Sequence, residues 1–141
     1  MLRDRRLAGA LIAIVVGALI LDATTGTLGR HVIETVPALL ALAAILRRRR
    51  WVSYAAMPVA VFWLVITAIT WMSELGLVSR IAGPTSTLHL FLMAAIGAAA
   101  VAALAAAALS RSTATVAARL GAFWAFAILQ LAALWLSLRL P

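Results

Sequence analysis

Few side chains in this sequence can transfer a proton or bind an ion, and they gather in a few short stretches. The 141-residue chain contains four acidic residues and two histidines. His31 and Glu34 are three residues apart, so a helix that has begun by His31 places both on one face. The candidates for acid–base catalysis are His31, Glu34 and His89. The candidates for a proton or cation path are Asp22, Glu34 and Glu74.

These residues are open to more than one interpretation. In the first, they are interfacial caps and ion pairs, with Arg30 and Arg80 neutralising the nearby acids, because charged residues at the ends of membrane helices commonly pair or reach toward the headgroups. In the second, the acids line a transport path. Against a continuous path, Thr67, Thr70 and Gln130 are the only clearly polar side chains expected near mid-depth.

A metal or haem site is a third interpretation, and the spacing gives it little support. The two histidines are not at His-x-x-x-His spacing, and the chain has no cysteine. The sequence therefore predicts no metal and no cofactor. The lack of cysteine also excludes disulfides and thiol chemistry.

The composition places these residues in a membrane protein. Hydrophobic residues make up 66% of the chain, charged residues 11%, and the mean hydropathy is +1.12. A soluble domain is roughly half apolar and about a quarter charged. This composition excludes a soluble enzyme, a nucleic-acid-binding module and a disordered tail.

The apolar runs predict an all-α fold, a polytopic integral membrane protein with a bundle of five transmembrane helices. We expect one transmembrane helical domain over residues 1–141. Its predicted spans are 7–27, 31–46, 52–73, 87–110 and 116–138. Asp22 then lies late in the first span and Glu34 early in the second, so both carboxyls are expected in the same third of the membrane. Pro37 is expected to kink the second span close to Glu34.

The basic residues predict the orientation of the bundle. All 12 cations are arginine, and the net charge is +8. In soluble proteins such a charge indicates nucleic acid, but here the arginines mark the loops that stay in the cytoplasm. With the N-terminus inside, nine arginines are cytoplasmic and three, Arg30, Arg80 and Arg139, are outside. We therefore expect an N-in, C-out protein of the cytoplasmic (inner) membrane.

Two further features concern contacts between helices. The fourth span is rich in alanine, which lets neighbouring backbones approach closely and suits a helix at the centre of a bundle. Gln130, near the middle of the fifth span, is expected to form an interhelical hydrogen bond.

The leading functional prediction is a small integral membrane protein that acts as an accessory or structural subunit through helix–helix association. Its expected partners are the lipid bilayer and other membrane subunits or further copies of the chain, and not nucleic acid. The alternative is a small proton- or cation-coupled transporter or channel. A membrane-embedded enzyme acting on a lipid-like substrate comes third, so the sequence leaves open whether the protein is an enzyme.

Overall fold

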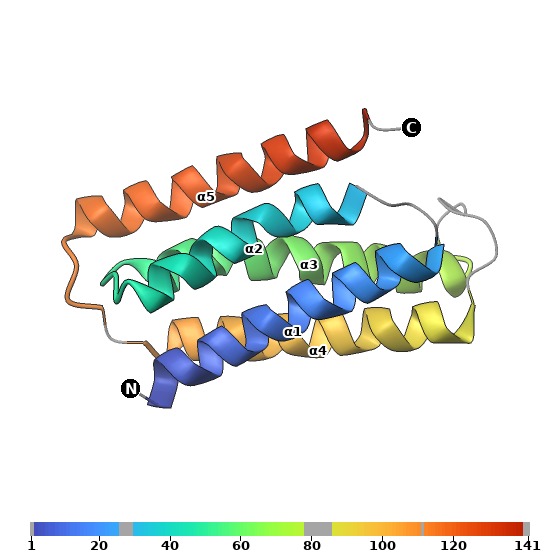
Figure 1. Cartoon of the computed structure of the whole chain (residues 1–141), viewed down its shortest axis with the longest axis horizontal. Coiled ribbons are helices and arrows are strands. Elements are labelled where there is room, and N and C mark those ends of the chain that lie inside the picture. The colour runs from blue at the N-terminus through green and yellow to red at the C-terminus, as the bar shows by residue number, and fades with distance from the viewer. Residues whose placement is uncertain (1, 26–29, 78–85, 111, 140–141) are drawn as a thin grey trace.

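The computed structural model describes residues 2–25, 30–77, 86–110 and 112–139, and within these ranges the chain forms five helices and no strand. The predicted all-helical fold is therefore confirmed. The helices follow one another back and forth along the long axis of the molecule (Figure 1). They are α1 (Leu2–Thr25), α2 (Arg30–Leu46), α3 (Val52–Glu74), α4 (Thr87–Ala108) and α5 (Val116–Ser137).

The helix bounds lie close to the predicted spans, with one informative difference. Helix α1 begins at Leu2 rather than at residue 7, so the arginine-rich start of the chain is helical. The last two residues of the predicted first span, 26 and 27, lie outside the described residues. Ser86 and Thr115 cap α4 and α5 with their hydroxyl oxygens, which accept from the backbone N–H groups of His89 and Ala118.

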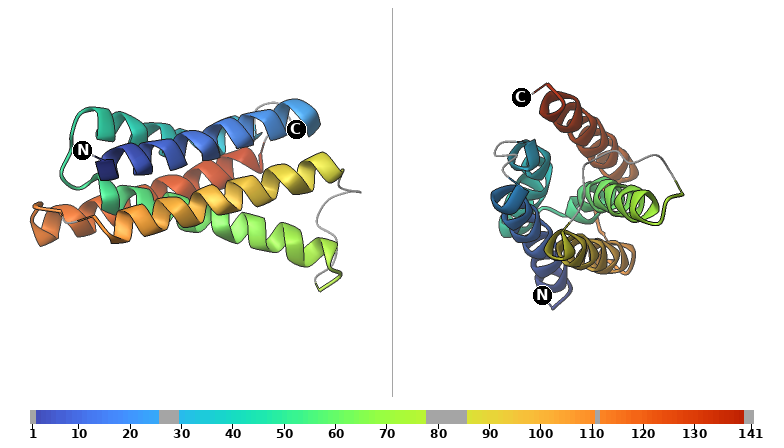
Figure 2. Two further views of the ribbon diagram at one scale, coloured as in Figure 1. Left: turned by 90° about the horizontal axis from the view of Figure 1, so that it is seen from below. Right: turned by 90° about the vertical axis from the view of Figure 1, so that its right-hand side faces the viewer.

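Helix α3 is the one with the most neighbours. It packs against α2, α4 and α5 and touches α1, while α1 packs between α2 and α4. Helix α5 lies on α2 and α3, and Figure 2 shows it at the edge of the bundle when the molecule is seen end-on.

The expectation that the alanine-rich helix is central is wrong. In the described structure α4 packs only on α1 and α3, and its other face is exposed. Small side chains do allow a close approach, since Gly97 on the buried face leaves room for the Thr67 side chain of α3. They do not determine how many faces of a helix are covered, because that depends on which neighbours the loops bring alongside.

The core lies between α1, α3 and α4. Leu11 and Ile14 of α1, Val59 and Trp63 of α3, and Ile96 of α4 are all fully buried. Among the contacts of the described residues, the Thr67 hydroxyl of α3 lies 3.5 Å from the backbone carbonyl of Met93 in α4. The α1–α4 and α3–α4 pairs are therefore held mainly by close packing.

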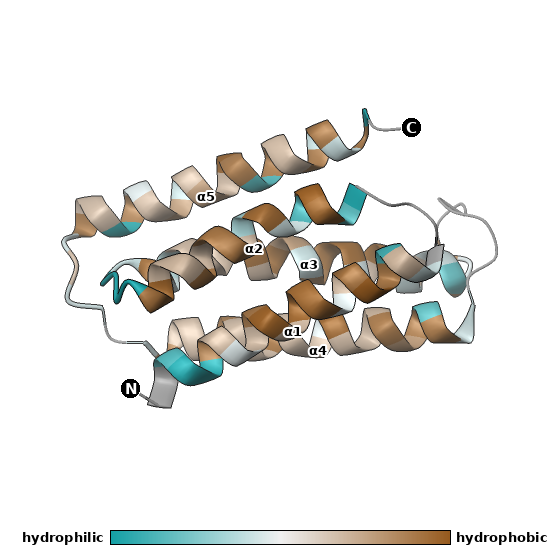
Figure 3. Ribbon diagram, viewed as in Figure 1, coloured by the Kyte–Doolittle hydropathy of each residue, from teal (hydrophilic) through white to brown (hydrophobic). Residues whose placement is uncertain are grey.

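Four helices, α1, α3, α4 and α5, are long and apolar enough to cross a membrane. Figure 3 shows their apolar middle parts between more hydrophilic ends. The exposed surface is itself apolar, with Phe91 68% and Leu131 63% exposed, which is typical of side chains that face lipid. Helix α2 has 17 residues and is shorter than the roughly 20 residues of a typical span.

Candidate functional site

The back-and-forth course of the helices gives the bundle two polar ends (Figure 3). We call them the arginine end, where Arg47–Arg50 follow the last residue of α2, and the acid–histidine end, where α1 ends and α2 begins. All the predicted site residues belong to the acid–histidine end, namely Asp22, His31, Glu34, Glu74 and His89.

Glu34 is the centre of the polar contacts at the acid–histidine end. It is only 6% exposed, and both of its carboxyl oxygens have partners. The imidazole Nδ1 of His31 lies 3.0 Å from Oε2, as the three-residue spacing predicts. The hydroxyl of Ser137 in α5 donates to Oε1 over 2.6 Å.

A second bond ties the same turn of α2 to α5. The side-chain amide Nε2 of Gln130 donates to the backbone carbonyl of Glu34 over 3.1 Å, and Gln130 is 2% exposed. The expected interhelical bond of Gln130 is thereby confirmed. Gln130 and Ser137 are seven residues apart, which is two helical turns, so they lie on one face of α5. From that face, both side chains donate hydrogen bonds to Glu34 of α2.

An aromatic side chain packs beside His31, and other buried polar atoms lie near this end of the bundle. The fully buried ring of Trp63 lies 6.3 Å from the imidazole ring, centroid to centroid. The indole N–H of Trp63 and the Oε1 of Gln130 have no hydrogen-bond partner among the described residues. Asp22 is 1% exposed and ends up buried at this end of α1.

Glu74 and His89 lie nearer the surface and do not join the direct contacts of Glu34. Both are half-buried, and His89 is within electrostatic range of His31 and Glu74. In the described part of the chain, Glu34 pairs with His31 and not with Arg30. Arg80, the other expected partner, lies outside the described residues. No group of three His or acidic side chains in the described ranges is arranged to hold a metal ion.

The geometry determines what chemistry this arrangement can perform. The buried carboxylate and imidazole can share a proton between Oε2 and Nδ1. The Ser137 hydroxyl bonds to the carboxylate rather than to the imidazole, so the histidine is not placed to activate it as a nucleophile. Sequence reasoning missed Ser137 and the packing of Trp63 on His31. The available signal was the seven-residue spacing from Gln130, which places Ser137 on the same face.

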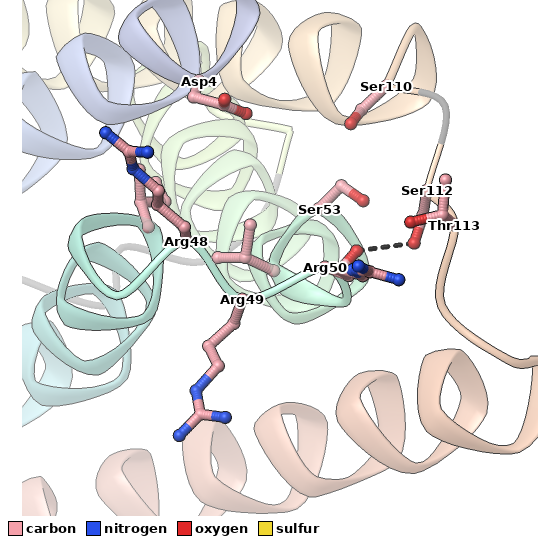
Figure 4. A pocket seen from close by; sticks show the side chains of 10 residues that line it. Asp4, Arg48, Arg49, Arg50, Ser53, Ser110, Ser112 and Thr113 are labelled. Atoms are coloured by element: carbon pink, nitrogen blue, oxygen red, sulfur yellow. Dashed lines mark hydrogen bonds between the residues drawn. The ribbon is translucent and has the colours of Figure 1, made fainter. Parts of the chain in front are cut away.

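The arginine end is built differently. The guanidinium of Arg119 donates to the backbone carbonyls of Ser112 and Ala114, and the Ser112 hydroxyl donates to the carbonyl of Arg50. These bonds join the start of α5 to the loop between α2 and α3. Figure 4 shows the polar cavity of about 310 Å³ at this junction, with Asp4 on one side and Ser112 on the other.

Comparison of the chain with protein-family models, with curated proteins and with solved structures finds no match.

Proposed function

We propose that this chain is a small integral membrane protein that acts as an accessory or structural subunit, and that it associates with a partner helix through the outer face of α4. The observation that carries the proposal is the composition of that face. Most of its exposed central positions are alanines, with the larger Val101 among them, and larger apolar side chains lie at its two ends. The exposed alanines are Ala94, Ala95, Ala98, Ala102, Ala105 and, at the end of the helix, Ala108.

Lipid supplies no hydrophobic drive for two helices to meet, so association in a membrane depends on packing. Small residues four apart, such as Ala94, Ala98 and Ala102, let two backbones approach closely enough for extensive van der Waals contact. Small residues also line the buried face of α4, where Gly97 and Ala100 pack against the neighbouring helices of the chain. A second helix on the exposed face would repeat this mode of packing.

The polar contacts around Glu34 are consistent with an internal structural role. Both carboxyl oxygens and the backbone carbonyl of this residue have partners, and two of these partners, Gln130 and Ser137, join α2 to α5. A carboxylate held in this way stabilises the short α2 within the bundle.

The proposal includes a topology. We propose that α2 also crosses the membrane, with Arg30 and Arg47 at its two ends reaching the headgroups, so that the chain has five spans. The arginine end would face the cytoplasm and the C-terminus the outside of a cytoplasmic membrane. The excess of arginine in the predicted cytoplasmic segments, nine against three, supports this orientation.

A second candidate is a proton- or cation-coupled transporter that uses Asp22, Glu34 and Glu74. The observation that favours it is the burial of two carboxylates, Asp22 and Glu34, at the same end of a helical bundle. Buried acids at membrane depth are often part of ion and proton pathways.

The two functions are separated by paired variants. The full chain is purified from its native membrane in mild detergent, and the mass of the resulting complex is measured. We expect a complex of defined stoichiometry that Ala98→Leu disrupts and that the matched change Ala132→Leu, on an exposed position of α5, leaves intact. Glu34→Gln should leave this complex assembled.

A chain that remains a monomer, or a complex that both leucine variants preserve, contradicts association through α4. Loss of pH-dependent uptake in Glu34→Gln proteoliposomes with assembly unchanged would favour the transporter instead.

A further inference from the structure

A groove between α2 and α5 opens at the arginine end, and its lining changes from apolar to basic along its length. Its volume is about 520 Å³, within the roughly 300–1,000 Å³ typical of ligand sites. The apolar part is formed by side chains of both helices, and the basic part by two arginines. The lining includes Leu40, Ala43, Phe126, Leu129, Arg47 and Arg49.

A second hollow continues from this groove toward the loops. It has a volume of about 430 Å³ and shares Arg47, Arg49 and Trp51 with the groove. Thr113 and Thr115 also line it, and Thr115 is the N-cap of α5. The hollow therefore combines guanidinium groups, hydroxyl groups and the N-terminus of a 22-residue helix, all of which favour an anion.

The side chains of Arg47 and Arg49 are not used to hold the fold together. Within the described residues, the guanidinium groups of Arg47 and Arg49 have no hydrogen bond, ion pair or cation–π contact. Arg119 differs, because it bonds to two loop carbonyls and lies over the Tyr54 ring. Figure 4 shows Arg48 directed to the side where Asp4 lies and Arg49 to the opposite side, where α5 runs.

Trp51 indicates the depth of the site. It packs against Phe126 of α5 with ring centroids 6.1 Å apart, at the boundary between the apolar groove and the basic hollow. Tryptophan is enriched where the hydrocarbon meets the headgroups. The apolar groove is thus placed at the depth of acyl chains and the arginines at the depth of phosphates.

We propose that this groove binds an anionic phospholipid, with its phosphate on Arg47 and Arg49 and one acyl chain between α2 and α5. Charge complementarity selects an anionic headgroup, and the continuous apolar groove below the arginines selects a lipid over a free anion. Basic pockets between membrane helices recognise anionic lipids in this manner. The lipid would fill the gap between the two helices at the end of the bundle opposite their bonds through Glu34.

The test measures lipid binding to the full chain, delipidated in neutral detergent, by native mass spectrometry. The probes are phosphatidylglycerol, phosphatidylcholine with the same acyl chains, and inorganic phosphate. We expect tight binding of phosphatidylglycerol only, weakened by about tenfold or more in the Arg47→Gln/Arg49→Gln double variant. The matched control, Arg5→Gln/Arg6→Gln, removes two exposed arginines of α1 outside the groove and should leave the affinity unchanged.

A further variant keeps every arginine and fills the groove. Ala43→Phe places a ring where the acyl chain is expected to lie, so it should also weaken phosphatidylglycerol binding. This variant tests the proposal even if the double arginine variant fails to fold. Equal weakening by both arginine pairs, equal binding of phosphatidylcholine, or equal binding of inorganic phosphate would overturn the proposal.

Discussion

Glu34 shows how a buried carboxylate is accommodated in an apolar bundle. An ionised group at membrane depth is expensive to bury alone, by about 2.5–3.5 kcal/mol on insertion scales. The carboxylate of Glu34 is not alone, because His31 on its own helix contacts one carboxyl oxygen and Ser137 on α5 donates a hydrogen bond to the other. The arrangement uses one contact that is local in sequence and one that spans 103 residues.

Replacement of Ser137 by alanine tests the longer of these contacts. Ser137→Ala removes the donor to a buried carboxylate, so we expect the free energy of unfolding to fall by about 1–2 kcal/mol. Ser53→Ala is the matched control, because the buried Ser53 hydroxyl has no partner among the described residues and its loss should be neutral or stabilising. The free energy of unfolding of each variant is measured by denaturation in mixed micelles. Equal losses in the two variants would show that the Ser137 bond contributes nothing.

At the level of single residues, sequence spacing predicted one part of the candidate site and missed another. The His31–Glu34 contact follows from helical periodicity, and the polarity of Gln130 in an apolar helix predicted its hydrogen bond without naming the acceptor. Ser137 was missed because its partner depends on how α2 and α5 pack. The seven-residue spacing places Ser137 on the same face as Gln130, but it does not specify which residue of α2 that face contacts.

A glycine of α4 faces a threonine of α3 where the two helices pack together. A Cβ atom at position 97 would lie 2.8 Å from the Cγ2 of Thr67, which is too close for either atom to keep its place. Thr67 is branched at Cβ and cannot easily turn its methyl group away. Gly97 therefore determines how closely the two helices pack.

Adding a methyl group at this contact is expected to be destabilising. Gly97→Ala should lower the free energy of unfolding by about 1–3 kcal/mol, because α3 and α4 must separate or Thr67 must leave its rotamer. Gly121→Ala on α5 adds the same group where nothing lies within 4 Å, so it should be neutral or stabilising through helix propensity. If Gly97→Ala is as stable as Gly121→Ala in the same denaturation assay, the close approach is not required.

The end of α2 contains a backbone conformation that favours glycine, yet the residue there is arginine. Arg48 has a φ of 51°. Its backbone N–H donates to the carbonyl of Ile45, and the backbone N–H of Arg49 donates to the carbonyl of Ala44. This is the Schellman pattern of helix termination, in which glycine is the usual residue. A side chain in this conformation costs about 1–2 kcal/mol.

Glycine at this position should therefore relieve strain. Arg48→Gly is expected to raise the free energy of unfolding by up to about 1 kcal/mol. Arg50→Gly, two residues later and without a positive φ, should lower it by about 0.4–1 kcal/mol because the unfolded chain gains freedom. A destabilised Arg48→Gly variant would mean that the side chain of Arg48 contributes more than its backbone strain removes.

The elements themselves were largely predictable, and their packing was not. Long apolar runs broken by arginine, glycine and proline specify where helices begin and end, so the predicted bounds of α3, α4 and α5 are close to those observed. The peripheral place of α4 could not be read from its alanines. Composition describes which contacts a helix face permits, whereas the loop connections decide which faces meet.

Seen as a whole, the molecule separates its charges along its long axis. Successive helices alternate in direction, so the loops rich in arginine meet at one end while Glu34 and its partners meet at the other (Figure 1). Three of the four acidic residues, Asp22, Glu34 and Glu74, lie away from the arginine end. This separation is the physical basis for expecting that each end faces a different side of a membrane.

The absence of cysteine from the sequence makes this arrangement directly testable. Single cysteines at Asp4, Thr113, Leu77 and Arg139 can be labelled with a membrane-impermeant maleimide in intact cells and in inverted membrane vesicles. Asp4→Cys and Thr113→Cys, at the arginine end, should react only in inverted vesicles, and Leu77→Cys and Arg139→Cys only in intact cells. This pattern requires an odd number of crossings, which four spanning helices cannot provide without α2. If Asp4→Cys and Arg139→Cys react from the same side, α2 does not cross the membrane, and Glu34 lies on a re-entrant segment instead.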